Sequence, residues 1–206
     1  LKRSWNVEAA VLDEKFPLFM EIGLSHSKAS IRMRTLELLN GFLDNQCTNV
    51  QKQISQSNQL QGIIFGLVHD VSEPVKVLFN DTITKLSKGN PDLQGIMCFN
   101  LLDELVQQTK DGITNAFEAL TQLFKNNQRN KEFFFQTNDL QSIIKPVLDG
   151  NQGAINLATV LLDCPTLAQK VEASQVASLI TLIDSGMQQG ITIVGLVLKS
   201  FPHFYK

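Results

Sequence analysis

The sequence lacks most of the residues that build catalytic, metal-binding and disulfide-rich sites. Its 206 residues include only three cysteines, three histidines, one tryptophan and one tyrosine. Cys47, Cys98 and Cys164 lie far apart and form no CxxC pair. This argues against a zinc site or a disulfide framework and favours a reducing compartment. We therefore predict a cytoplasmic location, although a first residue of Leu1 rather than Met leaves a removed targeting signal open.

A surplus of charge of one sign is also missing. The 18 Lys and Arg residues against 20 Asp and Glu residues give a net charge of -2. No basic surface for nucleic acid or anionic membranes is expected. Polar residues interrupt every apolar run before it reaches the roughly 18–20 residues that a membrane-spanning helix needs. The 43% hydrophobic content is nevertheless typical of a soluble globular domain. We expect neither a nucleic-acid nor a membrane partner.

Motifs that carry chemistry are absent or incomplete. Ser25-His26-Ser27-Lys28 matches S-x-x-K, but the companion S-D-N and K-T-G motifs are missing, so it indicates a turn between helices. His26, His69 and His203 have no set of ligands at metal-binding spacing. The glycines form no phosphate-binding loop. We predict no enzyme activity, no cofactor and no metal.

Two further segments have an ordinary structural interpretation. Asn80-Asp81-Thr82 fits the N-glycosylation sequon but lies inside an expected helix. Phe133-Phe134-Phe135 could be an exposed binding spot, but a core position is favoured.

A repeated pattern is the main feature that the sequence does have. Segments that begin at Asn58, Asn100, Asn138 and Ser174 all read polar-x-aliphatic-x-x-aliphatic-aliphatic, and a weaker copy begins at Phe16. The first four start 42, 38 and 36 positions apart. This is close to the period of about 40 residues in armadillo and HEAT arrays. Each segment forms a helical apolar stripe that one repeat alone cannot bury.

Each stripe is preceded by a short helix and followed by a longer one. The expected short helices are Val50–Ser57, Pro91–Phe99, Arg129–Thr137 and Pro165–Ala173. The expected longer, third helices are Ile31–Leu43, Pro74–Ser87, Ile113–Lys125, Gly153–Leu162 and Met187–Ser200. Turns are expected at Lys88–Asn90, Asn126–Gln128 and Asp149–Asn151. Trp5–Phe16 should pack on the first repeat.

No segment shows the period-two alternation of a strand. We predict an all-α fold, a right-handed armadillo/HEAT-like solenoid of about five short three-helix repeats. Residues 1–206 should form a single repeat domain. The apolar end, Phe201–Tyr205, is unlike a polar capping face, so the domain is expected to be part of a longer array.

Two stretches resemble known families. Asn130-Lys131-Glu132-Phe133 through Leu140 resembles the armadillo hallmark, with Asn in place of the usual Gly at the helix junction. Gly23–His26, Ser30–Leu36 and Phe99–Leu105 resemble proteasome assembly chaperones of the 26S non-ATPase regulatory subunit 5 type. That resemblance implies binding of a proteasomal ATPase subunit's C-terminal domain during assembly of the regulatory particle base.

The mode of action expected of such an array is protein binding on the concave face formed by the third helices. The candidate residues are the outward polar ones on these helices: Arg34, Glu37, Asp81, Lys85, Glu118, Gln122 and Asn156. Alternatives remain open: a likeness to armadillo nucleotide-exchange factors of Hsp70, a purely structural segment of a larger scaffold, or an enzyme in an unfamiliar helical fold. The last would show a cluster of perturbed pKa values in a closed cavity.

Overall fold

The computed structural model describes residues 7–137, 141–164, 168, 171, 177, 180 and 188–199. Within these ranges the regular secondary structure is helical and contains no strand. The chain divides into two units, Leu1–Ala119 and Leu120–Lys206, which are described separately below. Several expectations fall outside the described residues: those for Trp5, for the repeat starts at Asn138 and Ser174, for most of Pro165–Ala173, and for Phe201–Tyr205.

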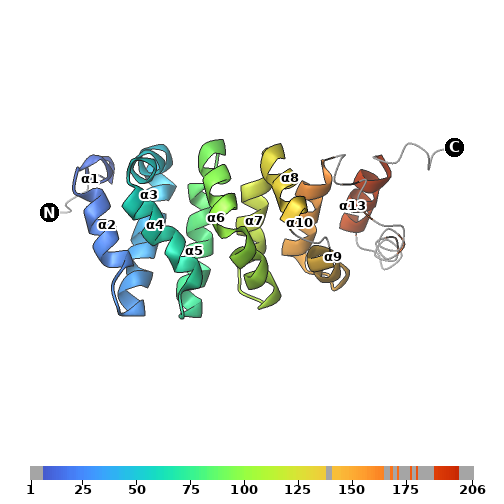
Figure 1. The fold of residues 1–206 in the computed structure, drawn as a ribbon, viewed down its shortest axis with the longest axis horizontal. Coiled ribbons are helices and arrows are strands. Elements are labelled where there is room, and N and C mark those ends of the chain that lie inside the picture. Colours follow the sequence, from blue (N-terminus) through green and yellow to red (C-terminus); the bar gives the residue numbers. More distant parts are fainter. Residues whose placement is uncertain are drawn as a thin grey trace. The chain divides into compact units, whose positions relative to one another are not determined.

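The first unit is built around one long helix. Its helices are α1 (Val7–Leu12), α2 (Phe16–Leu24), α3 (Ala29–Gln56), α4 (Asn58–Gly66), the 3-10 turn η1 (Leu67–His69), α5 (Glu73–Leu86) and α6 (Pro91–Lys110). They lie side by side in sequence order (Figure 1). The helices α1, α2, α4 and α5 all contact α3. The packing of α1 on α3 confirms, for its described part, the prediction for the segment before Phe16.

Helix α3 joins two helices that the sequence predicts as separate. The expected helices Ile31–Leu43 and Val50–Ser57 merge across a kink at Gln46, whose φ of −140° and ψ of 43° are not helical. Near the kink, the side chain of Asn45 donates to the carbonyl of Gly41 at 2.7 Å, and that of Asn49 donates to Gln46 at 3.0 Å. Such side chains compete with backbone hydrogen bonds and weaken a helix. The helix therefore bends here instead of ending.

The core of the first unit follows the helical apolar spacing. Leu36, Leu39 and Leu43 of α3 are buried, as are Phe79 and Ile83 of α5. Burying a side chain of this size contributes about 1.5–3 kcal/mol. The contact of α3 with α5 is therefore a main apolar interface of the unit.

The predicted break at Asn100 is wrong. Helix α6 continues from Pro91 to Lys110, so Pro91–Phe99 and the stripe that follows form one helix. Asn100 lies within it and donates its side-chain amide to the carbonyl of Ile96 at 2.7 Å. A helix junction does form before Asn58, where Ser57 accepts from the Leu60 amide at 3.1 Å. The difference is a capping serine, which Asn100 does not have in front of it.

The predicted register of the first repeat is also wrong. The pattern that begins at Phe16 implies that Leu18 and Ile22 face the core, but they are 57% and 64% exposed. Phe16, Met20 and Leu24 are buried instead. These residues are spaced four apart, so they form a helical stripe of their own. The aliphatic residues that matched the repeat thus form an outward face of α2.

A partly buried ion pair connects α3 to the turn before α5. The guanidinium of Arg32 makes two bonds to the carboxylate of Asp70, Nε to Oδ2 at 2.6 Å and Nη2 to Oδ1 at 2.9 Å. Arg32 Nη1 also donates to the carbonyls of His26 and Ser27, in the predicted turn between α2 and α3. Asp70 Oδ1 accepts from the Ser72 amide at 2.8 Å. One side chain therefore ties together two interhelical turns.

The ion pair alters the acidity of both partners. Burial raises the pKa of Asp70, but the hydrogen bonds from Arg32 and the Ser72 amide, with the charges of Arg32 and Lys76, outweigh burial and lower it. The hydrogen bond to Asp70 raises the pKa of Arg32. Both groups are therefore held in their charged forms.

Buried amide side chains make further links between consecutive helices. Gln51 of α3 donates to the carbonyls of Leu86 and Lys88 at 2.8 and 2.9 Å, at the last residue of α5 and just beyond it. Asn40 of α3 donates to the carbonyl of Leu78 at 3.5 Å. The bonds from Gln51 satisfy carbonyls at the end of α5, and the bond from Asn40 reaches the middle of that helix, so together they help to set the register of α3 against α5.

A second network extends from α5. The Asn80 side chain donates to Gln108 Oε1 at 3.0 Å and to the carbonyl of Thr114 at 3.3 Å. Gln108 in turn donates to the carbonyl of Val68 at 3.1 Å. Asn80 is fully buried, so the sequon is inaccessible in the folded chain. The side chain has a packing role, as its helical position indicated.

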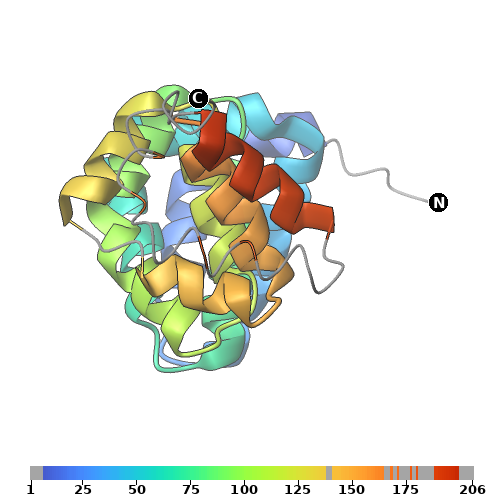
Figure 2. The same cartoon turned by 90° about the vertical axis from the view of Figure 1, so that its right-hand side faces the viewer.

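The second unit has the expected order of helices. It contains the C-terminal part of α7 (Ala116–Phe124), then α8 (Gln128–Thr137), α9 (Gln141–Leu148), α10 (Gln152–Leu162) and α13 (Gln188–Lys199). Here α8, α9 and α10 form a three-helix repeat of the predicted kind. Helix α10 contacts α9 and α13, which lie around it in Figure 2.

Aromatic packing supports the second unit. The ring of Phe134 is fully buried and meets Phe124 edge-on at 5.4 Å and Phe135 at 5.3 Å. Such pairs contribute about 0.5–1.5 kcal/mol beyond the burial of their area. The core position predicted for this phenylalanine run is therefore confirmed for Phe134.

The predicted turns are confirmed by their backbone conformations. Gly89, Asn126 and Gly150 have φ values of 67°, 56° and 79°. Asn115 has a φ of 67° and precedes Ala116, so α7 begins three residues later than the predicted Ile113. A left-handed residue interrupts a helix, and Asn tolerates that conformation better than most residues.

We expect the variant Arg32→Ala to lose about 1–3 kcal/mol of unfolding free energy, because it leaves a partly buried carboxylate without its charged partner. The matched control is Arg34→Ala, since Arg34 pairs with Glu37 while its side chain is 82% exposed. That variant should lose less than about 1 kcal/mol. Urea denaturation followed by circular dichroism measures both, and equal losses would contradict a structural role for the Arg32–Asp70 pair.

The pH dependence of stability should show the lowered pKa of Asp70. The ordinary pKa of the group is 3.8 and the folded value is lower. Its contribution is therefore fully present above the ordinary value and is lost as the pH falls through the folded value. As the pH falls below 3.8, the unfolding free energy should decrease less steeply for Asp70→Asn than for the unaltered chain. Chemical denaturation at a series of acidic pH values measures both slopes. Identical slopes would contradict the shift.

Candidate protein-interaction surface

The outward faces of α3 and α5 form one continuous surface of the first unit, here called the α3–α5 surface. It is formed by Met33, Arg34, Glu37 and Asp44 of α3 and by Glu73, Pro74, Val77, Leu78, Asp81 and Lys85 of α5. Their spacing of three, four and seven residues puts those on each helix near one side of it. The opposite sides of both helices hold the buried core residues.

A shallow cavity of about 400 Å³ lies in the middle of this surface. Its six lining residues are Met33, Glu37, Glu73, Pro74, Val77 and Leu78. Four of them are apolar and two are carboxylates, one from each helix. An apolar depression with acidic groups beside it can take an aliphatic or aromatic side chain whose neighbours are basic.

Ion pairs hold the charged residues next to the cavity. Arg34 Nη1 lies 2.7 Å from Glu37 Oε2 within α3. Lys85 Nζ lies 2.8 Å from Asp44, so this pair connects α5 to α3. In the part of the chain that the structure describes, Glu73 has no ion-pair partner. The surface carries four carboxylates and two basic side chains, which gives it a net negative charge.

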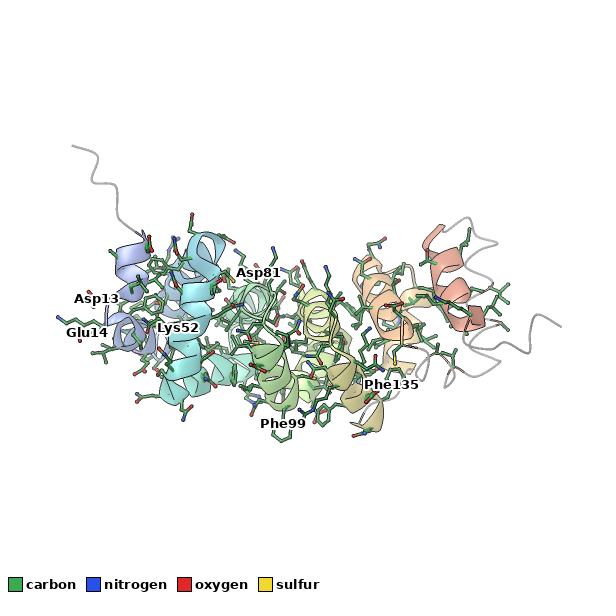
Figure 3. All side chains as sticks on the ribbon, turned by 90° about the horizontal axis from the view of Figure 1, so that it is seen from above. Asp13, Glu14, Lys52, Asp81, Phe99 and Phe135 are labelled. Atoms are coloured by element: carbon green, nitrogen blue, oxygen red, sulfur yellow. The ribbon has the colours of Figure 1, made fainter. Side chains whose placement is uncertain are left out.

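Asp81 is half-buried and has a structural role on this surface. Its carboxylate accepts a hydrogen bond from the side chain of Asn115, the left-handed residue before α7. Figure 3 labels Asp81 on α5. Reversing its charge would remove this bond as well as change the surface.

The structure brings together four of the seven predicted residues, Arg34, Glu37, Asp81 and Lys85. The other three are not joined to them. Glu118 is exposed on α7. Gln122 is half-buried in the second unit, and Asn156 there is exposed and accepts from Gln152 at 3.0 Å.

The sequence reasoning missed Asp44, Glu73 and the apolar floor. Asp44 lies seven residues after Glu37, so helical spacing could have found it. Glu73 was left out because the helix was predicted to begin at Pro74, whereas α5 begins at Glu73. The floor depends on how two helices pack, which spacing along one helix does not show.

Other chemistry was sought over the described residues. They contain no group of three or more His, Cys, Asp or Glu residues placed to hold a metal ion. No helix among them is long and apolar enough to cross a membrane. His69 and Glu104 approach to 3.5 Å with both side chains well exposed.

Comparison with known proteins adds the fold class. No family model matches the chain, and no curated protein matches it. Among solved structures, two crystal structures of Uso1 match with TM-scores of 0.71 and 0.70 and identities of 15% and 12%. Each match covers 95% of this chain and 33% or 35% of the other. A third, from work on a phosphorylation switch that controls the interaction between cadherin and β-catenin, has a TM-score of 0.68 at 14% identity, over 90% of this chain and 36% of that one.

These likenesses show the fold of the chain. The fold is an all-α helical-repeat solenoid of the armadillo/HEAT type, as the sequence predicts. The chain spans about a third of the length of the structures that it matches. The resemblance to proteasome assembly chaperones stays a prediction.

The thiols should differ sharply in reactivity. Burial raises the pKa of Cys98 to about 12, and it raises the pKa of the half-buried Cys47 by less. Because the thiolate is the reactive form, Cys98 should react with Ellman's reagent at pH 8 only when the chain unfolds. Cys47 should supply the early reaction in native protein, and Cys47→Ser should remove it. Rapid labelling of Cys98 in the native state would contradict its burial.

Proposed function

We propose that this chain is a non-catalytic scaffold that holds another protein on the α3–α5 surface. The observation that carries the proposal is the apolar cavity between Glu37 of α3 and Glu73 of α5. A partner side chain that fills such a cavity loses its water, and interface hot spots are of this kind. Acidic groups beside it favour a partner with Lys or Arg next to the anchoring residue.

The rigidity of the two helices also supports this role. The Arg32–Asp70 pair connects α3 to the turn before α5. The Asp44–Lys85 pair and the side-chain amide of Gln51 connect α3 to α5 itself. A surface that is already ordered loses less conformational entropy when it binds. The two helices therefore present their side chains in nearly the arrangement that a partner would meet.

A proteasomal ATPase subunit is the first partner to test. This choice rests on the resemblance of Gly23–His26, Ser30–Leu36 and Phe99–Leu105 to proteasome assembly chaperones. The ATPase domain of Hsp70 is the second, as for armadillo nucleotide-exchange factors. A purely structural role in a larger scaffold is the third possibility, and it requires neither partner.

The test is a binding measurement with purified proteasomal ATPase C-terminal domains and with the Hsp70 ATPase domain. The double variant Glu37→Lys with Glu73→Lys should weaken binding at least about tenfold, because it places positive charge on both sides of the anchor cavity. The control, Asp103→Lys with Asp149→Lys, makes the same change of charge at exposed positions outside the surface. Circular dichroism should show both variants folded.

The outcomes separate the alternatives. Binding of an ATPase subunit that only the first variant loses would support the assembly-chaperone proposal, and the same result with Hsp70 would move it to the exchange-factor class. Equal losses in both variants would count against the α3–α5 surface. Binding to neither protein, followed by an empty pull-down from cell extract, would leave the structural role.

A further inference from the structure

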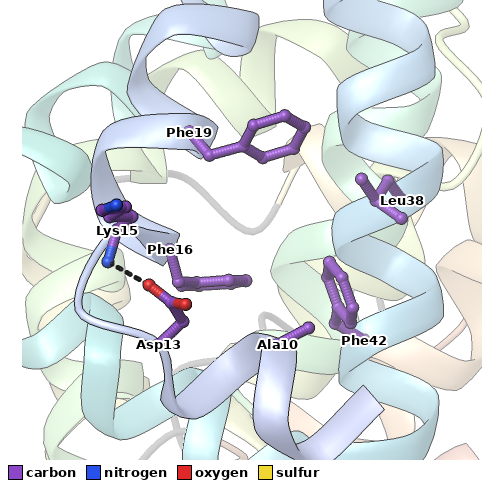
Figure 4. Close-up of a pocket in the computed structure, with 7 residues that line it drawn as sticks. All are labelled: Ala10, Asp13, Lys15, Phe16, Phe19, Leu38 and Phe42. Atoms are coloured by element: carbon purple, nitrogen blue, oxygen red, sulfur yellow. Dashed lines mark hydrogen bonds between the residues drawn. The ribbon is translucent and has the colours of Figure 1, made fainter. Parts of the chain in front are cut away.

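A second cavity lies between α1, α2 and α3, away from the residues of the α3–α5 surface. Its volume is about 670 Å³. The residues that line it are Ala10, Asp13, Lys15, Phe16, Phe19, Leu38 and Phe42. Figure 4 shows the side chains of Phe16, Phe19, Leu38 and Phe42 around the open space.

The wall of this cavity is aromatic and partly open to water. Phe16 and Phe42 meet edge-on with ring centroids 5.6 Å apart, which fixes one side. Phe19 is 58% exposed and Leu38 is 41% exposed on the other. Large apolar side chains that gather at one open cavity, instead of being scattered, mark an interaction site.

The charged residues that line this cavity are Asp13 and Lys15, and the two helices before α3 are acidic overall. Asp13 Oδ1 accepts from the Lys15 amide at 2.8 Å, which holds the carboxylate at the cavity edge (Figure 4). Asp13 and the exposed Glu14 lie together at this end of the first unit (Figure 3). Residues 7–24 as a whole contain four carboxylates and one basic side chain. A cationic partner is therefore favoured at the rim.

The same helices show what kind of segment such a surface accepts. Helix α4 packs against both α2 and α3 and inserts Leu60 and Ile64, which are fully buried. These residues are one turn apart on an amphipathic helix. A helix with aliphatic residues at this spacing therefore suits the surfaces that α2 and α3 offer.

We propose that the cavity of Phe16, Phe19, Leu38 and Phe42 docks an amphipathic helix of a partner protein. The helix presents large apolar residues three or four positions apart and carries Lys or Arg beside them, opposite Asp13 and Glu14. The net negative charge of residues 7–24 disfavours a second copy of this chain, because two such segments would repel each other. This site is independent of the proposed function, since it shares no residue with the α3–α5 surface.

The probe is a designed amphipathic helix of about 18 residues, long enough to be helical when bound, with Leu along one face and Lys on its flanks. A twin peptide has Glu in place of every Lys. Fluorescence anisotropy should show that the Lys peptide binds the unaltered chain at least about tenfold more tightly than its twin. Added salt should reduce that preference.

Two variants on α2 locate the contact. Phe19→Asp should weaken binding of the Lys peptide at least about tenfold, because Phe19 lines the cavity. Ile22→Asp makes the same change one turn away at a residue that is 64% exposed and does not line the cavity, and it should change binding less than about threefold. Asp13→Asn keeps the acceptor for the Lys15 amide and should lower the salt dependence.

The proposal would be overturned by equal binding of the two peptides, or by equal effects of Phe19→Asp and Ile22→Asp. It would also be overturned if the unaltered chain, but not Phe19→Asp, sedimented as a dimer, since the occupant would then be a second copy. Loss of partner binding in Glu37→Lys with Glu73→Lys, with the peptide result intact, would show that the two surfaces act separately.

Discussion

The bidentate pair of Arg32 and Asp70 is the interaction on which the arrangement of the first unit depends. A short carboxylate side chain in the turn after η1 would be costly to bury alone. With the guanidinium it joins the turn before α3 to the turn before α5. The direction of α3 relative to α5 follows from this link together with the apolar residues between them. The cavity of the α3–α5 surface is lined by residues of both helices, so its shape follows from how they pack.

Much of the fold could be predicted from local signals in the sequence. Helices α5, α8 and α10 begin and end within one residue of prediction, because turn residues with left-handed backbone, such as Gly89, Asn126 and Gly150, separate them. The wrongly predicted helix boundaries lie where the sequence has no capping or turn residue to start or end a helix. Asn100 has no capping residue before it, so α6 continues, and the weak helix formers around Gln46 bend α3 without ending it.

The candidate surfaces were less predictable, because they depend on contacts between helices. Helical spacing found Arg34 and Glu37, but it could not show that Met33 and Pro74 complete a cavity between two helices. The repeat pattern placed Leu18 and Ile22 in the core because their spacing matched Leu60 and Ile64. In α2 the larger Phe16, together with Met20 and Leu24, takes the core side instead. A periodic pattern shows that apolar residues share one side of a helix. Where a helix has two such sides, as α2 does, packing against its neighbours decides which of them is buried.

The bend at Gln46 makes one helix common to two successive repeats, and this affects how they come apart. In most repeat proteins each unit is a module that contacts its neighbours through side chains, so end units can melt alone. Here the third helix of one repeat meets the first helix of the next at the kink of Gln46, with no loop between them. Unfolding of the α1–α2 end removes contacts from α3, which α4 and α5 of the following repeat also contact. The two should melt cooperatively, as a single foldon, and an exchange or duplication of one repeat would have to cut through α3.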